Sequence, residues 1–273
     1  MPFARLFAVA ALVLSPSLVF AQGKSGIDRL YIFDCGQGTA ADMSRWTPGE
    51  NVGKPMDVVD NCYLIHHVNQ GYLLWDTGVT DAIAGRPEGP PPSNGAPNWR
   101  KPSTLAAQLE QVGVKPTDIK YLAISHTHPD HIGNVEMFPQ SMLLVQKAEY
   151  TWPSPLGVGR FKAEHPVKQL EGDYDVFGDG SVTILSTPGH TPGHQSLLVK
   201  LPKTGAILLS GDAVHFKDNW DKRRVPAGNT DKDKTLASMD RIAAVMAKEN
   251  AQLWINHDKA QSETLKHSPG FYE

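Results

Sequence analysis

The sequence predicts a mixed α/β domain in which helices cover β-sheets. Short β-rich runs occupy the first part of the chain, and helical segments alternate with strands after about residue 104. Polar groups that can bind a metal follow directly after several of the apolar runs, as in open α/β folds whose sites assemble beyond the strand ends. The 273 residues are enough for one large domain with a sizeable core. This mixture favours sheets covered by helices over a helical bundle or a β-sandwich.

Strands are expected wherever short apolar or β-branched runs are bounded by turn residues. The sequence Asn69-Gln70-Gly71 separates two such runs and predicts a hairpin between them. Another run, Tyr121-Leu122-Ala123-Ile124, leads straight into a cluster of histidines. The expected strands in chain order cover residues 30–33, 58–66, 72–76, 121–124, 142–145, 182–185, 196–201, 206–209 and 253–255.

Three helices are expected, in residues 104–112, 132–138 and 236–247. The first follows Pro102-Ser103 and ends before Gly113, a residue that commonly terminates helices. The last has the apolar spacing of an amphipathic helix. No internal repeat and no clear linker interrupts these elements, so residues 22–273 are expected to form a single domain.

Residues 1–21 have the features of a secretory signal peptide. Arg5 supplies a positive charge, residues 6–14 are apolar, and Val19-Phe20-Ala21 offers a small residue before a cleavage point. An uncleaved N-terminal anchor is the alternative, but the apolar run is short and is broken by Ser15-Pro16. Without a twin-arginine pair, export is expected by the general route to the periplasm or outside. No later stretch approaches transmembrane length, so no membrane association is expected after cleavage.

The formal net charge of −3 and the absence of a long basic run give no electrostatic reason to expect nucleic-acid binding. The chain has two cysteines, Cys35 and Cys62. They either form a disulfide, which an oxidising compartment would permit, or are small buried residues. The sequence does not decide between these options, and neither cysteine is assigned to chemistry.

Two irregular segments, residues 85–101 and 152–167, are rich in proline and glycine. Long irregular segments in a compact domain are either lids and binding loops or surface insertions without a role. Trp99 and Trp152 lie in them. Each tryptophan either lines an apolar pocket or packs against its surroundings, and both interpretations stay open.

The run His126-Thr127-His128-Pro129-Asp130-His131 places four metal-binding side chains within six residues. Successive side chains of a tight turn diverge, so these groups cannot all surround one ion. Two neighbouring ions can divide them, which predicts a dinuclear metal site.

Further metal-binding groups follow other expected strands or turns. The loop Gly189-His190-Thr191-Pro192-Gly193-His194 precedes one strand, and Asp212 and His257 each follow another. Imidazole and carboxylate ligands without thiolate suit zinc, manganese, iron or cobalt, and zinc is the commonest choice for hydrolysis.

These landmarks, in this order, resemble the metallo-β-lactamase superfamily over essentially the whole mature chain. The resemblance implies a four-layer αββα sandwich with two divalent ions, most commonly zinc. It implies that His126, His128 and His194 hold the first ion and that Asp212 bridges both. By the same resemblance Asp130, His131 and His257 hold the second ion. His190 fits no ligand position and is expected to have a structural hydrogen-bonding role, and Asp76 is expected to support a ligand histidine.

Within the superfamily, the chain looks most like the N-acyl homoserine lactone hydrolases. The zinc β-lactamases lack a carboxylate matching Asp212, and the flavodiiron reductases have glutamate where this chain has His128. The segments 61–64, 74–78, 187–197 and 210–213 are similar to the lactonases. One departure is clear: the lactonases commonly have a tyrosine that contacts the lactone carbonyl three residues after the bridging aspartate. This chain has His215 there.

The resemblance implies a mechanism in which a hydroxide between the two ions attacks the lactone carbonyl. His215 is expected to stabilise the negative charge that develops, and Asp130 to protonate the leaving alkoxide. The alternatives are another hydrolase on the same site (a phosphotriesterase, thioesterase or β-lactam hydrolase), or a metal-storing or iron redox protein. The ligand set argues against storage, and dimers are common in the resembled family.

Overall fold

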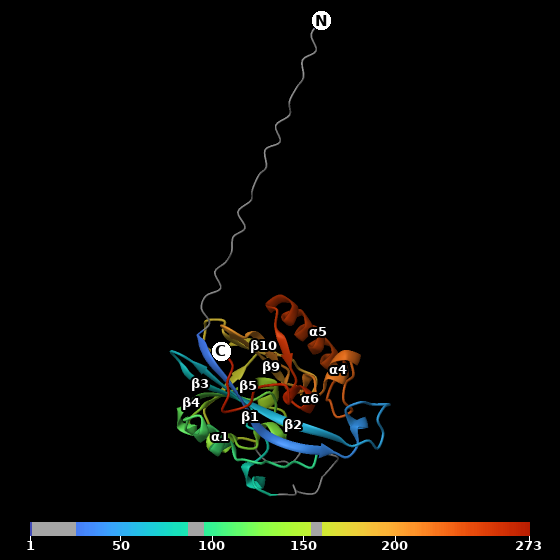
Figure 1. Cartoon of the computed structure of the whole chain (residues 1–273), viewed down its shortest axis with the longest axis horizontal. Helices are drawn as coiled ribbons and strands as arrows, with labels where there is room; N and C mark the ends of the chain where they lie inside the picture. The colour runs from blue at the N-terminus through green and yellow to red at the C-terminus, as the bar shows by residue number, and fades with distance from the viewer. Residues whose placement is uncertain (2–25, 87–95, 154–159) are drawn as a thin grey trace.

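The computed structural model describes Met1 and residues 26–86, 96–153 and 160–273, and its strands form two sheets (Figure 1). Apart from Met1, the proposed signal peptide lies outside these residues. The first sheet contains β1 (Ile27–Ala40), β2 (Met56–His67), β3 (Gly71–Trp75), β4 (Ile119–Ala123), β5 (Met142–Gln146) and β6 (Val167–Leu170). The second contains β7 (Tyr174–Asp175), β8 (Val182–Ser186), β9 (Gln195–Leu201), β10 (Gly205–Leu209) and β11 (Gln252–Trp254).

The described helices are mostly short. The α-helices are α1 (Leu105–Gln111), α2 (Pro129–Ile132), α3 (Lys147–Tyr150), α4 (Lys217–Lys222), α5 (Lys232–Glu249) and α6 (Lys259–Ser262). The 3₁₀ turns are η1 (Met43–Arg45), η2 (Asp81–Ile83), η3 (Pro116–Asp118), η4 (Val135–Met137) and η5 (Gly211–Ala213). The expected strands all form, and the predicted hairpin is confirmed by the antiparallel pairing of β2 with β3.

Each sheet combines antiparallel and parallel pairs. The first has the order β1-β2-β3-β4-β5-β6, antiparallel from β1 to β3 and parallel from β3 to β6. The second has the order β11-β10-β9-β8-β7, in which β10 and β11 are the parallel pair. The parallel strands matter for function because their carboxyl ends point the same way, which brings the loops after them together.

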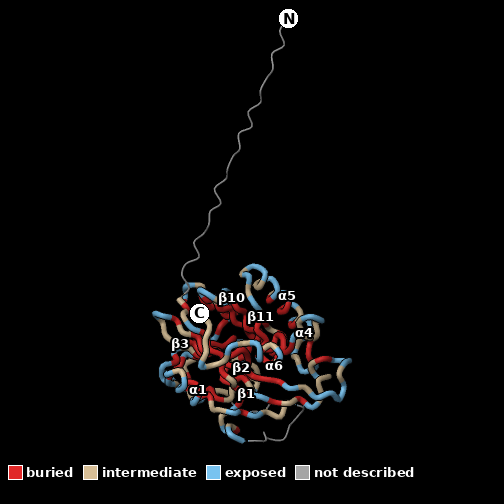
Figure 2. The backbone as a smooth tube through the Cα atoms, in the orientation of Figure 1, coloured by how far each residue is buried: buried red, intermediate tan, exposed pale blue. Residues whose placement is uncertain are grey.

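The main core lies between the two sheets. Alternate residues of the first sheet, such as Ile65 and Trp75, pack against Ile184 and Val199 of the second. The residues that alternate with them, such as Leu64 and Leu74, point outward and pack on the other face, against α1. Both faces of the central strands are therefore buried, as Figure 2 shows by the red interior, and such strands become nearly continuous apolar runs.

The helices cover the outer faces. The α1 side chains Leu105 and Leu109 pack on the first sheet, and Met239 and Ile242 of α5 pack on the second. Figure 1 shows α1 and α5 on opposite sides of the strands. The four-layer αββα arrangement that the resemblance implies is confirmed.

Two expectations about local structure are wrong. Residues 132–138 do not form one helix, because Gly133 packs so closely on the 78–80 turn that a Cβ would lie 2.4 Å from the Thr80 nitrogen. The amide of Asn134 then donates to the Thr77 and Val79 carbonyls and fixes the break. The end of the 152–167 segment is also not irregular, because Val167 begins β6.

No helix within the described ranges is long and apolar enough to cross a bilayer.

Candidate metal centre

The expected ligand residues converge from both sheets. The loop after β4 carries His126 and His128 and runs into α2, which carries Asp130 and His131. The β8–β9 loop carries His190 and His194, η5 after β10 carries Asp212, and the loop after β11 carries His257. Two groups of ligand atoms result, which we call the first cluster (His126, His128, His190, Asp212) and the second cluster (Asp130, His131, His257).

The imidazoles of the first cluster lie almost in contact. His126 Nε2 lies 2.8 Å from His128 Nδ1. His190 Nε2 lies 3.1 Å from His126 Nε2 and 3.0 Å from His128 Nδ1. Three ring nitrogens this close to one another can serve as ligands of one zinc ion.

The second cluster is more open. His131 Nε2 lies 4.0 Å from Asp130 Oδ1, and the Asp130 side chain is 21% exposed whereas that of His131 is fully buried. The ring of His257 lies 5.4 Å from the ring of His131. The partial exposure of Asp130 leaves its carboxylate accessible from the cavity described below.

Asp212 lies between the clusters, with one oxygen directed at each. Its Oδ2 is 3.7 Å from His126 Nε2 and 3.4 Å from His190 Nε2. Its Oδ1 is 3.4 Å from His131 Nε2 and 3.1 Å from His257 Nε2. Among the described residues, Asp212 Oδ1 and His131 Nε2 are buried and form no hydrogen bond. Such unsatisfied buried atoms fit a metal site, because burial without a partner is costly.

The structure groups His190, rather than His194, with the first cluster. His194 Nδ1 faces the Thr187 carbonyl at 3.0 Å, and its Nε2 accepts a hydrogen bond of 2.9 Å from the backbone N–H of Asp212. His190 is fixed in a similar way, with Nδ1 facing Asn229 Oδ1 at 3.0 Å. Both rings therefore present an Nε2 lone pair near the site, and the assignment of His194 as a ligand remains a prediction. The sequence had indicated only a structural role for His190.

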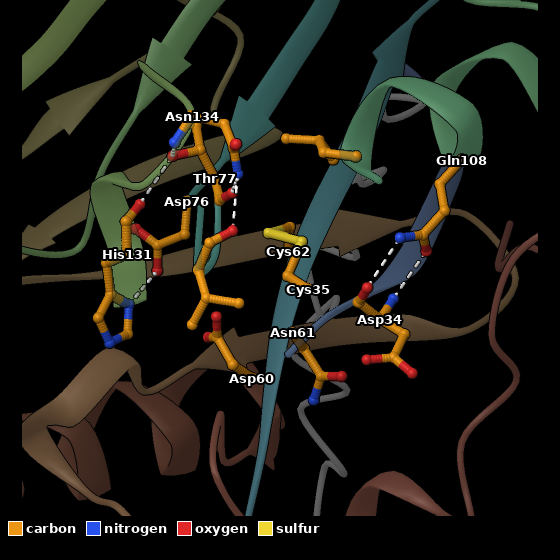
Figure 3. The surroundings of a disulfide bond; sticks show 12 residues. Asp34, Cys35, Asp60, Asn61, Cys62, Asp76, Thr77, Gln108, His131 and Asn134 are labelled. Atoms are coloured by element: carbon orange, nitrogen blue, oxygen red, sulfur yellow. Dashed lines mark hydrogen bonds and ion pairs between the residues drawn. A yellow bond between two sulfur atoms is a disulfide. The ribbon is translucent and has the colours of Figure 1, made fainter. Parts of the chain in front are cut away.

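Asp76 orients His131 of the second cluster through a side-chain contact. Its Oδ2 lies 3.0 Å from His131 Nδ1 (Figure 3). Its Oδ1 accepts a hydrogen bond of 2.6 Å from the Ser125 backbone N–H. The carboxylate therefore fixes which ring nitrogen of His131 is protonated and leaves Nε2 for an ion. Asp76 has a φ of +58°, an uncommon conformation that the surrounding turn maintains.

A disulfide lies against the turn that contains Asp76. Cys35 and Cys62 are bonded and link β1 to β2, which resolves the alternative left open by the sequence (Figure 3). Cys35 packs so tightly against Gly78 that a Cβ on Gly78 would lie 2.3 Å from the Cys35 Cβ. Gly78 ends the turn that begins at Asp76, so the disulfide contacts the segment that positions His131.

The pKa values of the imidazoles divide along the two clusters. Burial, with the neighbouring His131, holds the pKa of His126 well below its usual range, and burial also lowers the pKa of His128 and His190. Burial acts to lower the pKa of His131 and His257 too, but the nearby carboxylates, led by Asp212, together outweigh it. The pKa of His131 is therefore well above its usual range, and that of His257 rises to about 9.

His194 belongs electrostatically with the first cluster, since burial lowers its pKa to about 3. Burial raises the pKa of the Asp212 carboxyl, but His257 and the other imidazoles outweigh it and hold that pKa well below its usual range. Asp212 is therefore ionised and available as a ligand.

A cavity of about 290 Å³ opens onto both clusters. Aromatic and apolar side chains form much of its wall, among them Trp46, Val58, Trp99 and Phe216. His215 also lines it, with Nε2 3.1 Å from Asp212 Oδ2. Trp99 lines the cavity from the 85–101 segment, part of which (87–95) lies outside the described residues. Trp152 is not among the lining residues, and its ring lies 6.2 Å from that of His128.

Several residues of the site were not predicted from the sequence. Trp46 and Phe216 pack edge to face at 6.2 Å in the cavity wall, although 170 positions (216 − 46) separate them. Glu149 contacts two ligand loops through its buried carboxylate. The only sequence signal for Glu149 is a charged residue next to an apolar strand, which is too common to identify a site.

Comparisons with known proteins agree with this geometry. The model of the metallo-beta-lactamase superfamily matches residues 56–248. The N-acyl homoserine lactonase AttM of Azorhizobium caulinodans is 32% identical over 227 residues, 77% of this chain and 86% of that protein. An N-acyl homoserine lactonase of a Bacillus species is 34% identical over 238 residues, 84% of this chain and 91% of that protein.

Two solved structures of lactone hydrolases also match this chain. The crystal structure of a quorum-quenching N-acyl homoserine lactone hydrolase superimposes with a TM-score of 0.78 at 29% identity, covering 92% of this chain and all of that one. Another, with the product N-hexanoyl-L-homoserine bound at the catalytic metal centre, gives a TM-score of 0.76 at 28% identity over 90% of this chain and 99% of that one. With the fold, the ligand clusters and these relatives together, the chain belongs to the metallo-beta-lactamase superfamily and is a metal-dependent hydrolase.

Proposed function

We propose that this protein hydrolyses the lactone ring of N-acyl homoserine lactones and thereby quenches quorum signals. The observation that carries the proposal is Asp212, whose two carboxylate oxygens face two clusters of ligand atoms at the base of an apolar cavity. A bridging carboxylate is the feature expected of a two-ion hydrolytic site. The relatives named as N-acyl homoserine lactonases support the choice of substrate.

Two divalent ions, most commonly zinc in such sites, would occupy the clusters. As the resemblance implies, His126, His128 and His194 would hold the first ion. His190 is the alternative to His194 as its third histidine ligand. Asp130, His131 and His257 would hold the second, and Asp212 would contact both. When bound, the ions would polarise the lactone carbonyl and supply a hydroxide at neutral pH.

The remaining chemistry falls to side chains of the cavity. His215 lies where the resembled lactonases have a tyrosine, and an imidazole N–H there can donate to the carbonyl oxygen as negative charge develops. Asp130 is the group we assign to proton delivery, because its partial exposure lets it reach the leaving alkoxide. The aromatic wall formed by Trp46, Trp99 and Phe216 would receive the acyl chain, whose apolar surface gains from leaving water.

The test is ring opening of a long-chain and a short-chain acyl homoserine lactone by the purified protein, followed with a pH indicator. Paraoxon and a cephalosporin are assayed alongside as a phosphotriester and a β-lactam. We expect a kcat/KM of roughly 10⁴ M⁻¹s⁻¹ or more for a lactone and far slower turnover of the others. Inactivity on lactones with two equivalents of metal bound would contradict the proposal and leave another ester as the substrate.

The role of His215 is tested by two substitutions. His215→Phe keeps an aromatic ring but removes the donor, and we expect kcat to fall by roughly 100-fold. His215→Tyr restores a donor of the kind that the lactonases carry and should retain activity. An unchanged kcat in His215→Phe would remove the residue from the mechanism.

We also propose that the protein is exported, with residues 1–21 removed as a signal peptide, and that it acts in the periplasm or outside. The disulfide between Cys35 and Cys62 supports this, since disulfides persist mainly in oxidising compartments. N-terminal sequencing of protein recovered from fractionated cells would test it. A start near Gln22 is expected, and an intact N-terminus in the cytoplasm would contradict the proposal.

A further inference from the structure

Glu149 is a buried carboxylate that the proposed reaction does not use. It lies in α3, immediately after β5, and is 0% exposed. Its Oε1 accepts hydrogen bonds from the Thr127 backbone N–H at 2.8 Å and the Thr127 hydroxyl at 2.7 Å. Its Oε2 accepts one from the Gly193 backbone N–H at 3.0 Å. Both oxygens are thus satisfied by two segments distant in sequence.

Those two segments are the ligand loops of the first ion. Thr127 stands between His126 and His128, and Gly193 directly precedes His194. The first loop continues from β4 of one sheet, and the second leads into β9 of the other. A single side chain therefore links the two sheets at the place where the ligands of the first ion come together.

The contact between Glu149 and the second loop is close. A Cβ on Gly193 would lie 2.2 Å from the Glu149 backbone nitrogen and 2.5 Å from its Cβ. Only glycine lets the loop approach this far. The Gly193 N–H is thereby held against the carboxylate, and the position of His194 follows from it.

The charge of Glu149 also requires an explanation. An ionised carboxylate is costly to bury, and the hydrogen bonds above all come from neutral donors. The carboxylate lies against the two loops that carry His128 and His194. A divalent ion bound at the first cluster would be attracted by the same negative charge.

We infer that Glu149 is a positioning residue for the first metal ion, which ties the His126–His128 loop to the His194 loop and adds negative charge beside them. It touches no substrate and coordinates no ion itself. The inference rests on the proposed metal-dependent function, but it concerns a residue that lies outside the two clusters.

The experiment compares Glu149→Gln with a matched control, Asp175→Asn. Glutamine preserves the shape and the bonds to Thr127 but directs an NH₂ group at the Gly193 N–H. Asp175 is a less buried carboxylate whose two oxygens are also both bound, with Oδ1 accepting from Gly178 N–H at 2.9 Å and Oδ2 from Gly180 N–H at 2.8 Å, in a turn that carries no ligand. Each substitution therefore breaks one carboxylate bond to a glycine amide and removes one charge.

Metal affinity is measured by chelator competition with zinc, and the first site is followed by the visible spectrum of the cobalt(II)-substituted protein. We expect Glu149→Gln to weaken binding of one ion by roughly 10- to 100-fold and to shift the cobalt spectrum. Asp175→Asn should lower the melting temperature of the metal-free protein without changing either metal readout. If Glu149 had a purely structural role, Glu149→Gln would likewise lower the melting temperature and leave both metal readouts unchanged.

A second variant guards against misfolding of the first. Thr127→Val removes only the hydroxyl donor to Oε1, and we expect a loss of metal affinity of roughly fivefold. Wild-type affinity and an unchanged cobalt spectrum in Glu149→Gln or in Thr127→Val would overturn the inference. Failure of the wild-type protein to bind metal or to open lactones would instead overturn the proposed function, so the two failures are distinguishable.

Discussion

The first and second clusters of the metal centre are supported in different ways. In the second, the Asp76 carboxylate contacts the imidazole of His131 directly. In the first, the Glu149 carboxylate binds backbone and hydroxyl groups of the loops rather than any imidazole. In the second cluster a carboxylate orients a ligand ring directly. In the first cluster a carboxylate positions the loops that carry the ligand rings.

This difference has an electrostatic consequence. Burial keeps the pKa of His126 and His194 low, so these rings are neutral at pH 7 and ready to bind a cation. Burial acts to lower the pKa of His257 as well, but Asp212 raises it to about 9, so that this ring is protonated at pH 7 in the metal-free protein. Because ligands must lose their protons before they bind metal, occupation of the second cluster must release protons whereas occupation of the first need not.

The two clusters also differ in how the chain around them is crosslinked. Cys35 packs on the turn that starts at Asp76, and Cys62 lies in β2, where the Val59 carbonyl accepts the 2.7 Å hydrogen bond from His257 Nδ1. The disulfide therefore lies between supports of His131 and His257. The first cluster depends instead on the buried hydrogen bonds of Glu149.

The largest effect is expected from Asp212→Asn, which removes the charge that the two clusters share. We expect loss of both ions and of nearly all hydrolysis, because each cluster loses its common carboxylate. Metal content by mass spectrometry and lactone turnover measure it. A fully metallated and fully active variant would show that Asp212 does not bridge the ions.

A pair of substitutions at His194 and His190 tests which of these histidines is the third ligand of the first ion. We expect His194→Ala to lose one of two equivalents of metal and His190→Ala to retain both, because the resemblance assigns only His194 as a ligand. Metal content of the two purified variants is the measurement. The reverse result would give the third ligand position to His190, whose Nε2 faces both other imidazoles.

Asp76→Asn tests the support of the second cluster. The amide Nδ2 cannot accept the bond from His131 Nδ1, so we expect the affinity for one ion to fall by roughly 10- to 100-fold. We expect Asp76→Asn to weaken binding of the second ion and Glu149→Gln to weaken binding of the first. Cobalt spectra that change identically in both would contradict the separation of the two supports.

The smallest effect on the metal centre is expected when the disulfide is replaced in Cys35→Ala/Cys62→Ala. With a sequence separation of 27 residues, loop closure predicts a loss of roughly 3.5 kcal/mol in the free energy of unfolding. Urea denaturation of the metal-free protein measures it. Because Cys35 packs on the turn that contains Asp76, any loss of metal affinity should fall on the second ion. A loss confined to the first ion would contradict this expectation.

Much of the fold could be predicted because strands with two buried faces show as apolar runs. The residues 58–66 and 206–209 are examples, since each is bounded by polar or turn residues and lies close to the strand observed. The helix expected in 132–138 was wrong because Gly133 is fixed by a turn about 54 positions earlier (133 − 79), and no local pattern contains that contact.

The sequence by itself determined the chemistry, because residue type sets what a side chain can bind. The histidines and aspartates at the strand ends, the resemblance that orders them and the departure at His215 are all properties of the chain read in one dimension. The tertiary structure decided which groups meet. Glu149 lies between Thr127 and Gly193 because packing of the two sheets brings distant segments together, and Cys35 packs on Gly78 although they are far apart in the sequence. Contacts of that kind depend on the three-dimensional course of the whole backbone, so the local sequence around each residue does not predict them.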